Sequence, residues 1–273
     1  MNQLKIVLID VGWGDSIFLE SIDDNGDEHY ALIDSNDSTN NKSSLVFLKK
    51  YFQRKFNTAA ITKPVFDWVM LSHAHLDHGQ GLKKIMQEFG TEKFYYPKSV
   101  TNSNLAHLQN YANRAGINHQ ALDNNRVFPD FGDVEIKILW PNEDEISDNE
   151  NDNSIILSLS LHDQTCMLTG DAEEPVWEVI NAQIPNNTVF FKIPHHGSRN
   201  GSLKSNDMSG AWTNQIDNQV FLAMSTHNRP YNHPHQEVLD LLDSGGYTYG
   251  RTDDNYHLEV TVDQNGMVTK YST

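Results

Sequence analysis

The septet S-H-A-H-L-D-H, residues 72–78, constrains this chain more than any other feature. It places three imidazoles and one carboxylate within the six positions from His73 to His78. Packing alone gives no reason to keep so many polar groups together. Nitrogen and oxygen donors at such short spacing are what a borderline divalent cation such as zinc requires. The septet therefore predicts a metal site.

The segments on either side of the septet predict a strand, a loop and a helix. Residues 65–71 (V-F-D-W-V-M-L) are β-branched and aromatic, which is typical of a buried strand. Residues 79–89 place four apolar side chains at helical spacing, and Gly90 can end that helix. We therefore expect the donors in a loop on a rigid scaffold, where functional residues concentrate.

The rest of the chain alternates between strand-like and helix-like patterns in two similar halves. The start is typical of a β-meander, with strands expected at 5–10, 15–21 and 29–34. The other expected elements are helices at 42–56, 105–115, 175–182 and 235–242, and strands at 133–140, 154–161, 165–169, 188–194 and 219–225. This mixture predicts an α/β fold with two sheets sandwiched between helix layers. No shift in composition requires a boundary, so we expect a single domain, 1–273.

The composition narrows the class of protein. With 273 residues and 38% hydrophobic content, the chain can bury a large core. No apolar run reaches the roughly 18 residues that span a bilayer, and no secretory signal is visible, so we expect a cytoplasmic protein without a membrane partner. The single cysteine, Cys166, cannot form an internal disulfide. The net charge of −17 works against stable, non-specific binding to nucleic acid.

Polar donors recur downstream where expected strands end. L-T-G-D ends in Asp171, P-H-H-G-S contains His195 and His196, and R-P-Y-N-H-P-H contains His233. If these strand ends align, the donors converge on one site with the septet. For His233 a turn-stabilising role before Pro234 is the alternative.

These motifs, in this order, resemble those of the metallo-β-lactamase superfamily. H-x-H-x-D-H is the first signature of that family, and L-T-G-D and P-H-H-G-S follow it in this chain. With D-V-G-W-G-D at 10–15 and N-D-N-S at 151–154, the chain more narrowly resembles the lactamase-like domain of bacterial competence proteins of the ComEC type and its stand-alone relatives. The resemblance implies an αβ/βα four-layer sandwich of two mixed β-sheets flanked by helices.

The resemblance also implies two divalent metal ions, with zinc as the first expectation and manganese or magnesium as alternatives. The implied ligands are His73 and His75 for the first ion, Asp77, His78 and one histidine of the pair His195 and His196 for the second, and Asp171 as a bridge between them. We expect His195 to be the ligand of its pair because it leaves its strand first, and His196 then faces the substrate. Asp34 is expected to orient a ligand histidine.

The chain departs from the broader superfamily at one ligand position. Many members place a histidine before the strand that leads to the bridging aspartate, whereas this chain has N-D-N-S there. Asn153 or water could fill the gap. Because an amide oxygen is a harder and weaker donor than imidazole, the first site could bind loosely or favour manganese or magnesium.

Two cations about 3.5–4 Å apart can acidify a bridging water and clamp the oxygens of a reacting phosphate. Asp77 can orient the resulting hydroxide, and His196 or His233 could protonate a leaving oxygen. Lys192 and Ser198 could contact phosphate, although an ordinary strand-edge role is the alternative for Lys192.

Three hypotheses of function follow. The first is a metal-dependent phosphodiesterase that acts on nucleic acid or a nucleotide, a substrate class that only the resemblance supplies. The second is a hydrolase of another ester-type bond, namely a lactone, thioester, β-lactam or phosphorylcholine ester. The third is a non-catalytic metal-binding assembly module, against which the near-complete donor set argues. The sequence predicts no particular oligomeric state.

Overall fold

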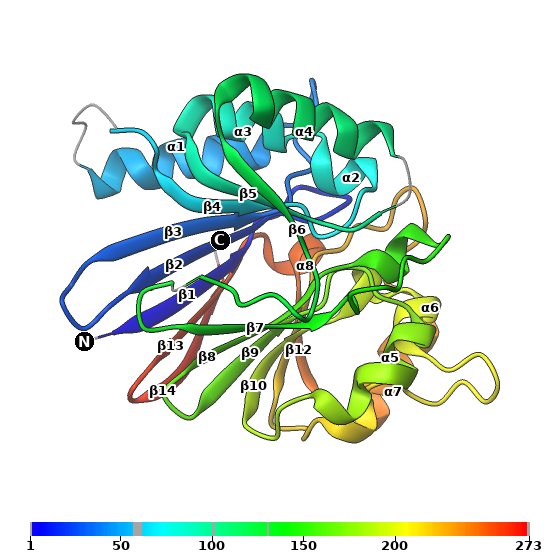
Figure 1. Cartoon of the computed structure of the whole chain (residues 1–273). Helices are drawn as coiled ribbons and strands as arrows, with labels where there is room; N and C mark the ends of the chain where they lie inside the picture. The colour runs from blue at the N-terminus through cyan, green and yellow to red at the C-terminus, as the bar shows by residue number, and fades with distance from the viewer. Residues whose placement is uncertain (1, 57–61, 100–101, 130, 272–273) are drawn as a thin grey trace.

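The strands form two mixed β-sheets that pack face to face in a computed structural model, which describes residues 2–56, 62–99, 102–129 and 131–271 (Figure 1). The strands are β1 (Gln3–Leu8), β2 (Ile17–Ile22), β3 (Glu28–Ile33), β4 (Phe66–Met70), β5 (Thr91–Pro97), β6 (Asn118–Leu122), β7 (Glu135–Trp140), β8 (Ile156–Leu161), β9 (Gln164–Leu168), β10 (Thr188–Lys192), β11 (Phe221–Met224), β12 (Thr248–Arg251), β13 (Leu258–Asp263) and β14 (Gly266–Tyr271). The larger sheet has the order β14-β13-β1-β2-β3-β4-β5-β6, and the smaller has the order β12-β11-β10-β9-β8-β7.

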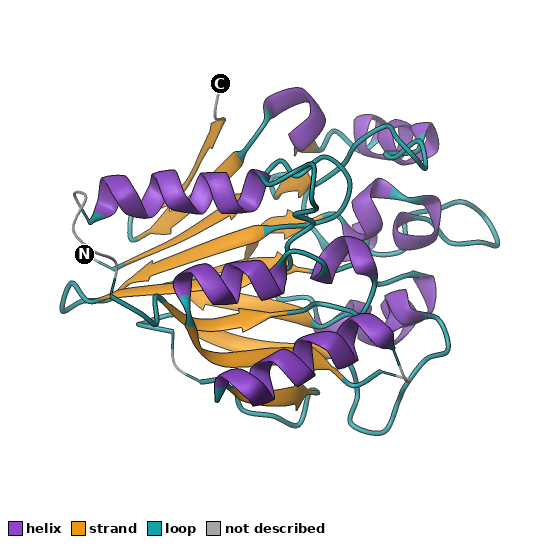
Figure 2. Ribbon diagram, turned by 90° about the horizontal axis from the view of Figure 1, so that it is seen from above, coloured by secondary structure: helices purple, strands orange, loops and turns teal. Residues whose placement is uncertain are grey.

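Helices outside the two sheets complete the four layers. The helices are α1 (Ser43–Lys55), α2 (Leu76–Gly79), α3 (Leu82–Phe89), α4 (Ser103–Ala115), α5 (Glu174–Ile180), α6 (Arg199–Ser202), α7 (Gln236–Ser244) and α8 (Thr252–Asn255). Figure 2 looks down on the outer layer, where helices lie across the strands of the larger sheet. The fold is therefore the αβ/βα sandwich that the sequence predicted.

Alternating side chains build the apolar layers. In β4, Trp68 and Met70 lie in the core between the sheets, whereas Val69 joins the cluster that includes residues of α1, α3 and α4. In β10, Phe190 lies between the sheets and Phe191 packs in the cluster of α5 and α7. Because side chains alternate along a strand, each central strand contributes to both layers and has a nearly continuous apolar sequence.

Each sheet consists of an antiparallel part and a parallel part. β1 to β3 and β7 to β9 are antiparallel, whereas β3 to β6 and β9 to β12 are parallel. The carboxyl ends of the parallel strands therefore meet at one edge of each sheet. α2 follows β4 and α6 follows β10, and both lie on the right-hand side of Figure 1.

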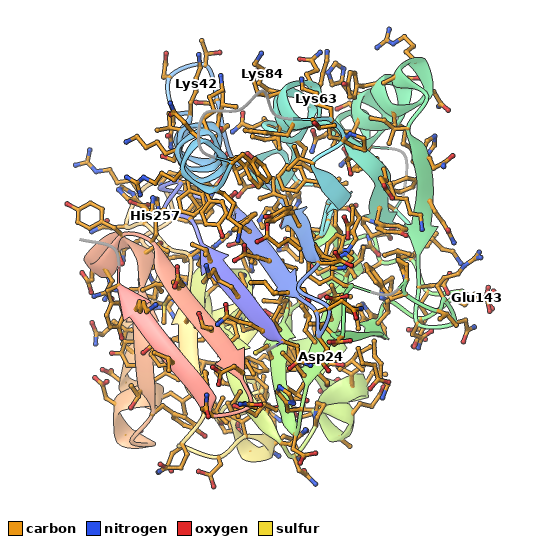
Figure 3. All side chains as sticks on the ribbon, turned by 90° about the vertical axis from the view of Figure 1, so that its left-hand side faces the viewer. Asp24, Lys42, Lys63, Lys84, Glu143 and His257 are labelled. Atoms are coloured by element: carbon orange, nitrogen blue, oxygen red, sulfur yellow. The ribbon has the colours of Figure 1, made fainter. Side chains whose placement is uncertain are left out.

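The expected strands and helices are confirmed within a few residues, with one exception. The helix expected at 79–89 begins three residues later, as α3, and the separate short helix α2 precedes it within the expected loop. The sequence reasoning missed β5, β6, β12, β13 and β14, of which β6 and β14 are half-exposed sheet edges. Within the described ranges, no helix has both the length and the apolar character that crossing a bilayer requires. Charged side chains such as those of Lys42, Lys84 and Glu143 project from the surface (Figure 3).

Candidate metal centre

Strand ends from both sheets deliver the predicted donors to one place. Asp34 follows β3, and the septet follows β4 in the larger sheet. Asp171 follows β9 and His196 follows β10 in the smaller sheet. The site therefore forms where the parallel edges of the two sheets face each other, which is why its residues are far apart in the sequence.

Asp171 is the centre of this cluster. Its Oδ2 atom lies 3.1 Å from Nε2 of His196, 3.2 Å from Nε2 of His78 and 4.0 Å from Nε2 of His73. All four side chains are buried. His75 completes the group through its Nδ1 atom, which lies 3.0 Å from Nε2 of His73.

The donor set fits two divalent cations. Ligand atoms of His73, His78 and Asp171 lie within 4.8 Å of one another, and so do those of Asp77, His78 and His196. The Nε2 atoms of His78 and His196 and the Oδ1 atom of Asp171 are buried without a hydrogen-bond partner among the described residues. Buried polar atoms in folded proteins are normally bonded, so these unpaired donor atoms indicate a site for cations.

The cluster shifts the pKa values of its members in opposite directions. Burial lowers the pKa of His78, but the carboxylates of Asp171 and Asp34 outweigh burial and hold that pKa well above its ordinary value. Burial and the neighbouring His78 hold the pKa of His73 well below its ordinary value. The pKa of Asp171 lies well below the ordinary value despite burial, because His196 and His78 stabilise its charged form.

Asp34 lies beside His78, a candidate ligand, where the sequence predicts an orienting residue. Its Oδ2 atom is 2.7 Å from Nδ1 of His78 and accepts a hydrogen bond from the hydroxyl of Ser72 at 2.6 Å, and its Oδ1 atom accepts one from the amide of Ser72 at 2.7 Å. These contacts hold the imidazole of His78 with Nε2 toward Asp171. Such an outer carboxylate fixes both the tautomer and the ring orientation of a metal ligand.

The geometry reverses the expected roles of His195 and His196. His196 is 0% exposed, its Nδ1–H donates to the carbonyl of Ser225 at 2.8 Å, and its Nε2 points to Asp171. His195 instead places Nδ1 2.9 Å from Oε1 of Glu173 and lines the cavity above the cluster. Both histidines have left-handed backbone, with φ of 47° and 54°, so the chain turns sharply after β10 and the second side chain points inward.

Two residues expected to contact phosphate have structural roles instead. Lys192 is 0% exposed, and its Nζ atom lies 2.7 Å from Oδ2 of Asp15 and donates to the carbonyl of Gly170 at 3.1 Å. It balances charge beneath the cluster and does not reach the cavity. Ser198 caps α6, since its Oγ accepts a hydrogen bond from the amide of Gly201 at 3.0 Å.

Asn153 does not fill the gap in the first site. Its Oδ1 atom accepts from the amide of Ser147 at 2.8 Å, and its Nδ2 atom donates to the Ser147 carbonyl at 3.0 Å. The same amide lies 3.4 Å from Glu150, which accepts a hydrogen bond from the amide of Ala74 at 3.0 Å. Asn153 therefore supports the septet loop through Glu150 and does not offer its amide oxygen to the metal-donor cluster.

Asp15 is a member of the cluster that the sequence reasoning missed. Its carboxylate is buried, pairs with Lys192, and lies 3.7 Å from Nδ1 of His196. The sequence G-W-G-D-S could have indicated a functional role for Asp15, because it places a charged residue directly before an apolar strand. Gly14 is required there, because its φ is +89° and a Cβ atom would lie 2.3 Å from the carbonyl oxygen of Asp77.

A cavity of about 400 Å³ opens above the cluster. Its walls are formed by Trp13, His75, Leu76, Asp77, Asp171, His195, Tyr231 and His233. Burial and the nearby His196 and His195 lower the pKa of His233 to about 3, so this imidazole is neutral at neutral pH. The expectation that His196 faces the substrate is wrong, because its ring is buried below the cavity.

The fold and the site together define a metal-binding αβ/βα sandwich, and sequence comparison agrees. The model of the Metallo-beta-lactamase superfamily matches residues 63–210, and this chain belongs to that superfamily, whose members generally are metal-dependent hydrolases. The chain is also 26% identical over 261 residues to ComE operon protein 3 of Bacillus subtilis (strain 168). That match covers 93% of this chain and 32% of the relative, so the chain spans about a third of that protein.

Solved structures show the same fold. The metallo-beta-lactamase fold protein YhfI from Bacillus subtilis matches with a TM-score of 0.56 and 13% identity, over 92% of this chain and 96% of its own. CmlA, a diiron beta-hydroxylase from Streptomyces venezuelae, matches with a TM-score of 0.52 and 12% identity, over 99% of this chain and 54% of its own. At these identities the likeness concerns the fold alone.

Proposed function

We propose that this chain is a metal-dependent phosphodiesterase that acts on nucleic acid or a nucleotide. The observation that carries the proposal is the pair of overlapping donor groups around Asp171 at the floor of an open cavity. We assign His73, His75 and Asp171 to one cation, and Asp77, His78, His196 and Asp171 to the other. When bound, the two cations supply Lewis acidity to a phosphate oxygen and lower the pKa of a water molecule.

Residues of the cavity wall supply the proton transfers. The side chain of Asp77 is 25% exposed, so it can accept a hydrogen bond from the attacking water and hold its proton. The water oxygen bonds to phosphorus, the bond from phosphorus to the leaving oxygen breaks, and that oxygen takes up a proton. His195 is the better placed donor for this proton, because it lines the cavity and the carboxylate of Glu173, 2.9 Å from its Nδ1 atom, orients its ring.

The two cation sites differ in the number of protein donors. The segment N-D-N-S stands where the broader superfamily supplies another histidine, and its Asp152 instead accepts a hydrogen bond from the amide of Glu173 at 3.2 Å. With two imidazoles at each site, the first site therefore has one protein donor fewer than the second, which also has Asp77. We propose zinc for the second site and a weaker, more exchangeable ion, zinc or manganese, for the first.

Charge on the rim of the cavity supports a phosphate-bearing substrate. Residues 225–235 contain Arg229 and three histidines but no carboxylate, although the whole chain has a net charge of −17. This loop provides two walls of the cavity, Tyr231 and His233. A locally non-acidic rim reduces the electrostatic cost of bringing a phosphodiester to the site.

A second candidate is the hydrolysis of a lactone, thioester, β-lactam or phosphorylcholine ester. The observation that favours it is Leu76, whose side chain is 61% exposed on the cavity wall and offers an apolar surface to an acyl group.

A substrate panel separates the two candidates. Zinc-loaded or manganese-loaded protein is incubated with bis-p-nitrophenyl phosphate, single-stranded DNA and a set of lactones. We expect the phosphodiesters to be cleaved. Cleavage of the lactones alone would reject the phosphodiesterase.

Asp77→Ala tests the site itself. We expect turnover of bis-p-nitrophenyl phosphate to fall more than about 100-fold, because the variant loses both a ligand and the acceptor for the water proton. Thermal unfolding should stay cooperative, since Asp77 lies on the cavity wall. The matched control is Asp163→Ala, which changes an exposed turn aspartate between β8 and β9 and should keep the full rate. A wild-type rate in Asp77→Ala would show that the septet is not the catalytic centre.

A further inference from the structure

A row of aromatic rings forms one wall of the cavity above the metal donors. The ring centroid of Trp13 lies 4.6 Å from that of Tyr231 and 4.8 Å from that of His196. The ring of His233 lies beside them, 5.2 Å from Trp13 and 6.2 Å from Tyr231. The row therefore runs from the exposed rim of the cavity down to a residue of the donor cluster.

The outer end of this row is open to solvent. Tyr231 is 61% exposed, and Trp13 is partly exposed between two left-handed glycines, Gly12 and Gly14. The other four tryptophans, all of them in the described part of the chain, are at most 6% exposed. An exposed tyrosine in tilted contact, at 50° between the ring planes, with the one accessible tryptophan provides flat apolar surface that the folded chain does not itself cover.

The rings and the metal donors share one cavity, and this arrangement indicates which class of ligand fits. Trp13 and Tyr231 line the same cavity of about 400 Å³ as Asp77 and Asp171. A cavity of this size accommodates a ligand of nucleotide dimensions. A phosphate at the donors leaves the adjoining group of the ligand against the rings, and aromatic side chains stack on any nucleobase because every base has a π-face.

We infer that Trp13 and Tyr231 form a nucleobase-binding subsite, which selects a phosphate ester that carries a flat heteroaromatic ring next to the reacting phosphate. This inference rests on the proposed function and names its substrate class. The ring contact is independent of base identity, so the subsite confers no sequence preference.

The charge of the rim distinguishes a nucleobase from the other ligand that aromatic side chains bind well, a quaternary ammonium group. Such a cation is attracted by aromatic faces combined with nearby carboxylates. The loop that carries Tyr231, residues 225–235, has no carboxylate and places Arg229 two residues before it. The two carboxylates that line the cavity, Asp77 and Asp171, belong to the donor cluster, so the loop beside the rings offers an ammonium group no carboxylate partner, whereas a stacked neutral base needs none.

Binding measurements test the subsite without requiring turnover. Zinc-loaded protein is titrated with thymidine 5′-monophosphate, methyl phosphate and phosphorylcholine, followed by calorimetry and by tryptophan fluorescence, to which Trp13 contributes the accessible ring. We expect thymidine 5′-monophosphate to bind the wild type more tightly than the other two probes and to quench the fluorescence. In Tyr231→Ala its Kd should rise about tenfold, and in Tyr231→Phe it should stay within about twofold of the wild type, because the ring is kept.

The control variant is Tyr271→Ala, which removes an exposed tyrosine of β14 outside the cavity and should leave every Kd unchanged. The Kd of methyl phosphate should not change in any of the variants. The subsite is refuted if thymidine 5′-monophosphate binds no tighter than methyl phosphate, if Tyr231→Ala weakens both equally, or if phosphorylcholine is the probe that depends on Tyr231. Failure of the proposed function gives a different result. Phosphodiester turnover would then be absent, while nucleotide binding would still depend on the ring of Tyr231.

Discussion

At the scale of single residues, two adjacent histidines after β10 have different surroundings and so different tasks. His196 is enclosed by Asp171 and the Ser225 carbonyl, which leaves its Nε2 atom for a cation. His195 is partly exposed, and its partner is Glu173. Glu173 is held in turn by Asn149 and by Asn151, whose amides donate to it at 2.9 Å. The pKa of Glu173 lies below its ordinary value despite burial, because of His195 and Asn151.

Substitution of the two histidines separates their roles. His196→Ala should lose bound metal and lower turnover by more than about 100-fold, since loss of even an outer partner of a metal ligand typically costs 10- to 100-fold. His195→Ala should keep the wild-type metal content while its turnover falls. Elemental analysis of both purified variants gives the metal-to-protein ratio. Metal lost from His195→Ala and retained in His196→Ala would reverse the assignment.

At the scale of elements, polar contacts attach the helices to the sheets at a few defined points. Glu20 of β2 is 1% exposed and lies 2.8 Å from Nζ of Lys55 in α1 and 3.0 Å from Nζ of Lys5 in β1. Burial raises the pKa of Glu20, but the two lysines outweigh burial and hold it below the ordinary value of 4.5. In the smaller-sheet half, the Ser198 cap begins α6 directly after the histidine pair that follows β10.

The Glu20 contact predicts a defined pH dependence of stability. Because the pKa of Glu20 is lower in the folded chain, its contribution is present above about pH 4.5 and is lost as the pH falls through the folded pKa. Glu20→Gln should lower the free energy of unfolding by about 2 kcal/mol at pH 7, and the difference from the wild type should shrink in acid. Urea unfolding of the wild type and the variant, at pH 7 and in acid, measures this difference in the free energy of unfolding. Glu135→Gln, which breaks a solvent-exposed pair with Lys137, should cost less than about 1 kcal/mol at either pH.

The Ser198 cap predicts an effect on stability alone. Ser198→Ala removes the hydrogen bond from the amide of Gly201 and should lower the free energy of unfolding by about 1 kcal/mol. The Km for bis-p-nitrophenyl phosphate should not change, because the hydroxyl faces the helix. Steady-state kinetics and thermal unfolding together check this prediction. A tenfold rise in Km would instead support the expected contact between Ser198 and phosphate.

At the scale of the whole molecule, charge is unevenly distributed between the surface and the site. The net charge of −17 lies on a surface rich in acidic loops, such as 142–153. Inside the cluster, Asp15, Asp34 and Asp171 are buried with Lys192 and the imidazoles as their counter-charges. Two bound cations would offset this buried negative charge, so the site couples metal binding to the stability of both sheets.

Metal removal should therefore destabilise the whole fold. Treatment with a chelator should lower the Tm, and added zinc at about 100 times its Kd should restore about 2.7 kcal/mol of stability. The same titration with Asp171→Asn should produce a much smaller shift, because that variant lacks the shared carboxylate. Calorimetry with and without zinc measures both proteins. An equal Tm for chelated and zinc-loaded wild type would show that the cluster holds no structural cation.

The sequence alone determined the local chemistry of this protein. The septet, the aspartate of L-T-G-D and the apolar runs of β4, β9 and β10 are contiguous patterns, and their residue types predict donors at strand ends in an α/β sandwich. Only the tertiary structure decided which donors meet. The choice of His196 over His195 depends on two left-handed backbone angles, and the pairing of Asp15 with Lys192 depends on how the two sheets pack. The direction of a side chain and contacts between distant segments arise from packing, which linear spacing does not encode.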